Sequence, residues 1–173
     1  MKRLLAVPLL VVLAGCSADP YPLLSPPGAS TWNPAGIGTP VRNVVLYLQP
    51  RPGDRVEIIG AEAVGTLAGT DVRFYFSPPV LRADGSRTIG DKLEPLVGAS
   101  VAVDSRASPG PDNDVGIVVE LTPRTTGTFS VTAIRLHFRL NGGPEQVKEG
   151  ISQLFTLCAA DPAPKDCGPT PPG

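Results

Sequence analysis

The sequence of 173 residues has few of the side chains that most enzymes and metal proteins use, with one histidine, His137, and three cysteines. A serine nucleophile activated by histidine would depend on His137, and no Gly-x-Ser-x-Gly turn is present. A zinc site would lack the usual group of histidine and free thiol ligands. No glycine-rich segment has the strand-loop-helix context in which phosphates are bound. The sequence therefore predicts no catalytic residue, no metal and no cofactor.

Long apolar runs and an excess of basic residues are also lacking. Residues 4–13 form an apolar run of about ten residues, whereas a helix that spans a membrane needs ~20. Lys and Arg number 15 against 16 Asp and Glu, and loss of Lys2 and Arg3 with a cleaved signal would lower the formal net charge from −1 to −3. A nucleic-acid partner, which needs a basic surface, is therefore disfavoured.

The start of the chain has the order of a secretory signal, because two basic residues precede the apolar run and small residues follow it. Residues 13–16, Leu-Ala-Gly-Cys, resemble the lipobox of bacterial lipoproteins. The resemblance implies that residues 1–15 are removed and that Cys16 is acylated, so that lipid holds the protein at a membrane outside the cytoplasm. Two or three acyl chains give lasting anchoring. The alternative is an ordinary signal whose end carries a cysteine.

Residues 16–40 contain six prolines and three glycines, which predicts a Pro/Gly-rich tether between the membrane and a folded domain. We expect Trp32, the one tryptophan, to dock on the edge of that domain, with a role in binding as the alternative.

Cys158 and Cys167 enclose a polar, proline-containing loop. An even pair of cysteines in an exported protein predicts a disulfide, which would pin the Pro-rich tail of residues 159–173 to the last strand. A metal or redox pair is disfavoured, because the spacing is not Cys-x-x-Cys and no histidine is near.

From residue 41 onward, short apolar runs alternate with turn residues, and no segment has a helical period. Asn141-Gly142 favours a tight hairpin, and a change in the phase of the apolar residues predicts a β-bulge near Ala133. These features predict an all-β fold, a single antiparallel immunoglobulin-like β-sandwich of about seven or eight strands over residues 41–158. The expected strands are residues 44–49, 55–59 with an extension to 64 left open, 71–76, 99–103, 115–121, 127–140 and 145–158.

Residues 115–123, followed by 127–129 and the long arm up to 141–143, resemble uncharacterised actinobacterial secreted lipoproteins with such sandwiches. The resemblance covers about residues 41–158 and rests on strand and turn patterns. It brings no catalytic residue to this chain.

Arg135, His137 and Arg139 alternate with apolar residues and should form a basic stripe on the outer face of a sheet. Such a stripe would bind a carboxylate, a phosphate or an anionic glycan, and Arg73 and Tyr75 are candidates for the same side. The alternative is a solvated sheet face on which the arginines pair with Glu145 or Glu149 across the hairpin.

Paired carboxylates are the remaining route to catalysis. Asp54 with Glu57, or Asp112 with Asp114, are candidates by proximity. Asp112-Asn113-Asp114 weakly resembles a calcium loop but lacks its later ligands, so a turn rich in Asp and Asn is the default.

Taken together, these observations favour a lipid-anchored, non-enzymatic module that binds an envelope protein or glycan, or has a structural role, in the cell envelope. One alternative is a hydrolase of envelope polymers that uses carboxylates. Another is a ligand carrier, which would need an apolar cavity between the sheets, and few aromatic residues occupy the inward positions.

Overall fold

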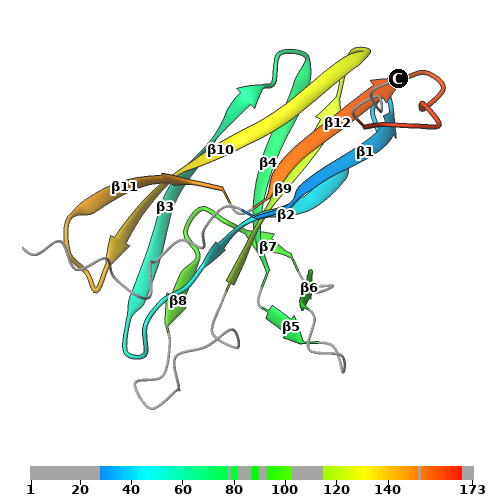
Figure 1. The fold of residues 1–173 in the computed structure, drawn as a ribbon. Helices are drawn as coiled ribbons and strands as arrows, with labels where there is room; N and C mark the ends of the chain where they lie inside the picture. The colour runs from blue at the N-terminus through cyan, green and yellow to red at the C-terminus, as the bar shows by residue number, and fades with distance from the viewer. Residues whose placement is uncertain are drawn as a thin grey trace, which may run out of the picture.

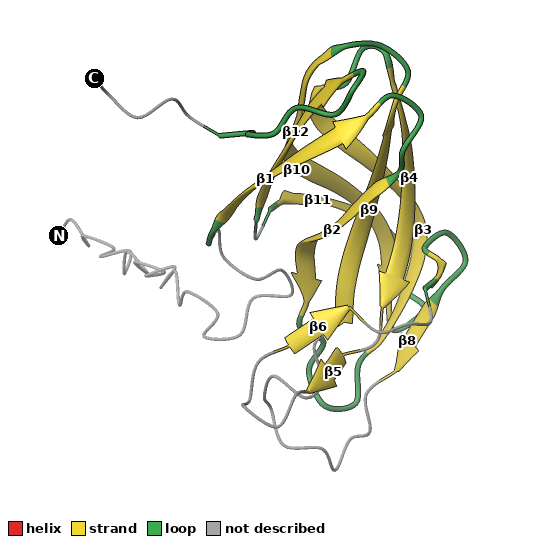
Figure 2. Ribbon diagram, turned by 90° about the vertical axis from the view of Figure 1, so that its right-hand side faces the viewer, coloured by secondary structure: helices red, strands yellow, loops and turns green. Residues whose placement is uncertain are grey.

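The computed structural model describes residues 28–77, 79–81, 87–89, 93–102, 115–151 and 153–168. In this part of the chain the regular structure is β-strand, arranged as two sheets that pack face to face, seen from two sides in Figure 1 and Figure 2. The predicted all-β, immunoglobulin-like sandwich is therefore confirmed. None of the described residues forms a helix long and apolar enough to cross a membrane.

The larger sheet has six strands in the order β1-β12-β10-β3-β8, and β11 pairs with β10 beside β12. Its strands are β1 (Ser30–Gly36), β3 (Arg55–Thr66), β8 (Ser100–Ala102), β10 (Gly127–Leu140), β11 (Glu145–Gly150) and β12 (Leu154–Ala160).

The smaller sheet has the order β2-β9-β4-β7. Its strands are β2 (Val41–Leu48), β4 (Thr70–Ser77), β7 (Glu94–Pro95) and β9 (Val115–Pro123). A separate pair consists of β5 (Pro79–Leu81) and β6 (Arg87–Ile89).

Inward side chains of the two sheets form one apolar core, because successive residues of a strand point to opposite faces. Each such side chain that is fully buried stabilises the fold by roughly 1.5–3 kcal/mol. Members of this core that are fully buried include Leu46, Leu48, Val56, Ile117, Val119, Leu121, Val131, Ile134, Leu136, Phe138, Phe155 and Leu157.

Strand β10 contains the β-bulge predicted near Ala133. Val131 lies opposite Gly65 and Ala133 opposite Val64, so Thr132 is the extra residue. The bulge restores the phase of the apolar residues, and the residues on both sides of it remain in the core. The predicted hairpin is also confirmed, because Asn141 and Gly142 have positive φ values of 53° and 72°.

The expected arm over residues 145–158 is in fact two strands, β11 and β12. They pair with different parts of β10, and the break between them lies opposite the bulge. Within the break, the backbone N–H of Gln153 donates a hydrogen bond to the carbonyl of Val45 at 3.1 Å. Val45 is itself an extra residue in the pairing of β2 with β9. The break therefore ties the larger sheet to the smaller one.

The predicted tether over residues 16–40 is too long. Its residues 30–36 form β1, which pairs with β12 in parallel, so this pair also departs from the expected antiparallel order. Proline is tolerated here because β1 is an edge strand, where a missing N–H need not break a ladder. The sandwich also extends at its other end, because Ala159 and Ala160 belong to β12 rather than to the tail. The predicted signal and Cys16 lie outside the described residues.

Candidate functional site

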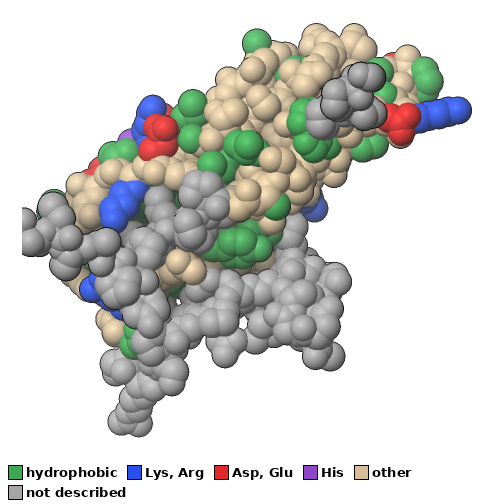
Figure 3. All heavy atoms as spheres, viewed as in Figure 1, with side chains coloured by type: hydrophobic (Ala, Val, Ile, Leu, Met, Phe, Trp, Pro, Cys, Tyr) green, Lys and Arg blue, Asp and Glu red, His purple; other side chains and the backbone are tan. Residues whose placement is uncertain are grey.

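The outer face of the larger sheet has a charged half, formed by β3, β10 and β11. The three basic residues of the predicted stripe all lie here and point outward, as expected. In Figure 3 basic, acidic and histidine side chains lie at the left-hand end, where Figure 1 shows β10 and β11, and a second acidic and basic group lies at the right-hand end. The charged half consists of Arg55, Glu57, Glu62, Arg135, His137, Arg139, Glu145 and Glu149, and the exposed Lys148 lies on β11 beside them.

Arg135 bridges two glutamates that lie opposite it on neighbouring strands. Its Nη1 donates to Glu62 Oε2 and its Nη2 to Glu149 Oε2, both at 3.1 Å. These hydrogen bonds, first to Glu149 and then to Glu62, raise the pKa of Arg135 above its ordinary value.

His137 and Arg139 face carboxylates in the same way. His137 Nδ1 lies 3.1 Å from Glu145 Oε1, and its buried Nε2 lies 3.8 Å from Glu62 Oε1 without a hydrogen bond. Arg139 Nη1 lies 3.8 Å from Glu57 Oε2.

The structure thus corrects the hypothesis of an anion-binding stripe. Three arginines and one histidine share this face with four glutamates, so the stripe presents no excess of positive charge to an approaching anion. The alternative pairing with Glu149 holds for Arg135, while Glu145 pairs with His137. Arg135 and Arg139 also face two glutamates of β3, Glu62 and Glu57. This pairing could not be predicted from the sequence, because it depends on the register of β3 with β10.

Arg73 and Tyr75 lie on the other sheet, in β4, and not beside the stripe. Tyr75 belongs to a cluster around Glu120, whose side chain is only 4% exposed. Arg42 Nε donates to Glu120 Oε2 at 2.6 Å, and the Tyr75 hydroxyl donates to Oε1 at 3.4 Å. The hydrogen bond to Glu120 raises the pKa of Arg42, whose guanidinium also lies 5.5 Å from the Tyr75 ring centre.

The sequence offered little sign of this cluster, because Glu120 reads as a solvent-facing residue of an alternating strand. It is buried because β9 is a central strand with neighbours on both sides. The cluster is a satisfied structural network.

The carboxylates proposed for hydrolysis have other partners. Asp54 accepts hydrogen bonds from Asn141 Nδ2 at 3.1 Å and from the backbone N–H of Arg51 at 3.0 Å. Glu57 lines a hollow of about 500 Å³ together with Arg55, Gly98, Ser100, Asn141 and Gly142. Among the described residues that line it, Glu57 is the one carboxylate.

Asp112 and Asp114, with the suggested calcium loop, lie outside the described residues. In the part of the chain that the structure describes, no group of three or more His, Cys, Asp or Glu residues is arranged to hold a metal ion.

The other half of the outer face has a different character, and we call it the uncharged half. It consists of β1, β12 and residues 127–133 of β10, three adjacent segments without any charged residue. Trp32 lies beside Thr156, which lies beside Ser130, and the Trp32 side chain points outward and is 40% exposed. Leu154, also outward, is 43% exposed. Trp32 therefore belongs to the edge strand β1 and does not dock on the domain from a tether, and its indole N–H donates to no acceptor among the described residues.

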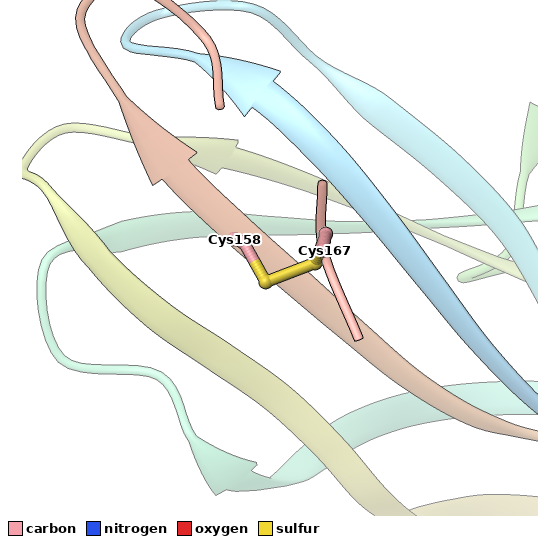
Figure 4. The surroundings of a disulfide bond; sticks show 2 residues. All are labelled: Cys158 and Cys167. Atoms are coloured by element: carbon pink, nitrogen blue, oxygen red, sulfur yellow. A yellow bond between two sulfur atoms is a disulfide. The ribbon is translucent and has the colours of Figure 1, made fainter. Parts of the chain in front are cut away.

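The predicted disulfide joins Cys158 in β12 to Cys167 in the tail, with the two Cα atoms 5.6 Å apart. Cys158 alternates with the buried Leu157 and so faces outward, on the same side as Thr156. Figure 4 shows the segment around Cys167 crossing beside β12. The tail is therefore pinned at one end of the uncharged half.

Comparisons with known proteins give architectural likeness at low identity. No protein-family model matches the chain, and no curated protein matches it. One similar solved structure is the ASH/PapD-like domain 7 of human CEP192, with 7% identity, a TM-score of 0.44, and coverage of 90% of this chain and 97% of that one. Another is the Proteus mirabilis ambient-temperature fimbriae adhesin AtfE, with 11% identity, a TM-score of 0.26, and coverage of 78% and 99%. Both scores are below 0.5, so the fold rests on the sheets described above and the function on the residues of this chain.

Proposed function

We propose that the protein is a lipid-anchored, extracytoplasmic β-sandwich module that makes a non-catalytic contact with another component of the cell envelope. The anchor is the acylated Cys16, and the contact surface is the uncharged half of the larger sheet. The observation that carries the proposal is the exposure of Trp32 and Leu154 on this surface, whose strand segments carry no charge. Large apolar side chains that lie exposed together on one face of a sheet mark interaction sites.

The distribution of hydrogen bonds supports binding over hydrolysis. Arg135, His137 and Arg139 of the charged half lie against glutamates, and Asp54 is held in a turn by Asn141 and Arg51. A glycosidase needs two carboxylates on either side of a substrate, about 5–10 Å apart. The hollow beside Glu57 offers one such group among its described lining residues.

The anchor is tested by labelling cells with an alkyne-tagged fatty acid. We expect label on the wild-type protein and none on Cys16→Ser, which lacks the acceptor sulfur. Label on Cys16→Ser equal to that of the wild type would remove the anchor from the proposal.

The contact surface is tested by photo-cross-linking in intact cells. A photoreactive amino acid in place of Trp32 should give adducts, and the same amino acid in place of the exposed Val97, which lies in the turn before β8, is the control. Equal adducts from both positions, or none from position 32, would overturn the assignment of the surface.

A further inference from the structure

The uncharged half lies where the chain enters the domain from the predicted tether. Strand β1 begins at Ser30, and Leu154 is the register partner of Ser30 in β12. Trp32 follows two residues later on the same outward side. The exposed apolar side chains of this half are thus the ones next to the point where the chain arrives from Cys16.

The length of chain before this point limits how far the surface can move from an anchored Cys16. Sixteen residue steps separate Cys16 from Trp32, and a fully extended chain covers at most about 3.3–3.6 Å per residue, or roughly 55 Å. Strand β10 alone, with 14 residues at about 3.3 Å each, is roughly 46 Å long. Anchoring therefore confines Trp32 to within about one domain length of the bilayer, which raises its effective concentration there.

Charge determines which half of the outer face can approach lipid. The strands of the charged half hold four glutamates against three arginines, Lys148 and His137, and contact with a bilayer interface would take these charged side chains out of water at a high cost. The uncharged half has no such penalty, because its three strand segments carry no charge.

The side chains themselves suit the boundary between water and lipid. Tryptophan is enriched at membrane interfaces, where its ring is buried and its N–H remains hydrogen-bonded to water or headgroups. Leu154 adds an aliphatic side chain that offers nothing to the hydroxyl groups of a sugar. A neutral glycan, the other ligand for an exposed tryptophan, would stack on the indole and bury less apolar surface against Leu154 than an acyl chain would.

From these observations we infer that the envelope component in contact with the uncharged half is the bilayer interface itself, into which Trp32 and Leu154 insert. This inference rests on the proposed lipid anchor. It sets the orientation of the domain, with the larger sheet towards the membrane along its β1 edge and the smaller sheet away from it.

Trp32 is the one tryptophan of the chain, so its fluorescence reports this contact directly. The full chain is made in a bacterial host that acylates it, its mass is checked for acyl chains, and it is reconstituted in phosphatidylcholine vesicles. We expect Trp32 emission at shorter wavelength than in unlipidated Cys16→Ser, weaker quenching by acrylamide, and quenching by lipids with brominated chains.

Leu154→Asp should reduce the quenching of Trp32 by brominated lipid, because a charge beside the indole opposes insertion. Val97→Asp is the matched control, since Val97 is a more exposed aliphatic side chain, at 61%, in a turn whose Gly98 pairs with Ile58 of β3. Trp32 lies level with Ser130 of β10, and Ile58, the partner of the turn, lies level with Phe138. The turn is therefore eight residues, or roughly 26 Å, away along the sheet. We expect Val97→Asp to leave the quenching unchanged.

The outcomes separate the inference from the proposal beneath it. A protein without acyl chains would overturn both the anchor and the membrane contact. An acylated protein in vesicles whose Trp32 is quenched by acrylamide as in Cys16→Ser would overturn the membrane contact alone. A spectral change with neutral cell-wall polysaccharide and none with vesicles would replace lipid by glycan as the ligand.

Discussion

Gly65→Ala is the sharpest test of how the larger sheet is built. Gly65 lies in β3 opposite the bulge of β10 and has a φ of +150°, a region that other residues rarely adopt. A Cβ added there would lie 1.9 Å from the carbonyl oxygen of Ser130, a backbone atom that cannot turn aside. The strained backbone costs about 1–3 kcal/mol and the overpacking about 1–3 kcal/mol more. We therefore expect a loss of about 4 kcal/mol in the free energy of unfolding, a large share of the ~5–15 kcal/mol of a typical domain.

The same strand provides a matched control for this substitution. A Cβ added to Gly60 would meet its nearest neighbour, His137 Cβ, at 3.7 Å, an ordinary contact. Gly60→Ala should therefore be neutral or stabilising by up to ~1 kcal/mol, because alanine loses less backbone entropy than glycine. Both variants are measured by urea denaturation, followed by circular dichroism. A loss below about 1 kcal/mol for Gly65→Ala would refute the reasoning about the bulge.

Two ion pairs give further predictions. Arg42→Ala leaves the nearly buried Glu120 carboxylate with the Tyr75 hydroxyl as its remaining partner. We expect this variant to lose about 2–3 kcal/mol in the free energy of unfolding, measured by urea denaturation. The loss is below the full cost of breaking a buried ion pair, because Arg42 is half exposed. Glu120→Gln should cost about 1 kcal/mol, so a larger loss for Glu120→Gln than for Arg42→Ala would contradict this account. The hydrogen bond from Arg124 lowers the pKa of Asp71 below its ordinary value of 3.8. The ion pair therefore stabilises the fold at pH values above 3.8, and this stabilisation is lost as the pH falls through the lowered pKa. Between pH 5 and pH 3 the urea midpoint of the wild type should fall more than that of Asp71→Asn. If the midpoints of both proteins fell equally with pH, the ion pair would not contribute to stability in this range.

Features that depend on neighbouring residues could be predicted from the sequence. Alternation of apolar and polar side chains located the long strands, because it follows from the two faces of a strand. The bulge near Ala133 followed from the requirement that both halves of β10 reach one core. The Asn141-Gly142 hairpin followed from the preference of these residues for positive φ.

Features that depend on register between distant strands could not be predicted. The membership of β1 in the sheet requires pairing with β12, more than 120 residues away, and its proline content suggested a tether. The charge of the outer face depends on Glu57 and Glu62, which lie opposite Arg139 and Arg135 only because each of β3 and β10 carries an extra residue. A change of register by one residue would have moved these glutamates into the core.

The parallel pairing of β1 with β12 has a mechanical consequence. The chain enters β1 at Ser30 and leaves β12 at its opposite end, so tension between the two chain termini slides the strands past each other and loads their hydrogen bonds together. The disulfide moves the point of loading, because force from the tail passes through Cys167 to Cys158 and bypasses the residues between them. The pairs that bear the load are then those from Ser30 with Leu154 to Pro34 with Cys158. The domain is thereby built so that tension between its two ends loads β1 and β12 in shear and does not unzip them.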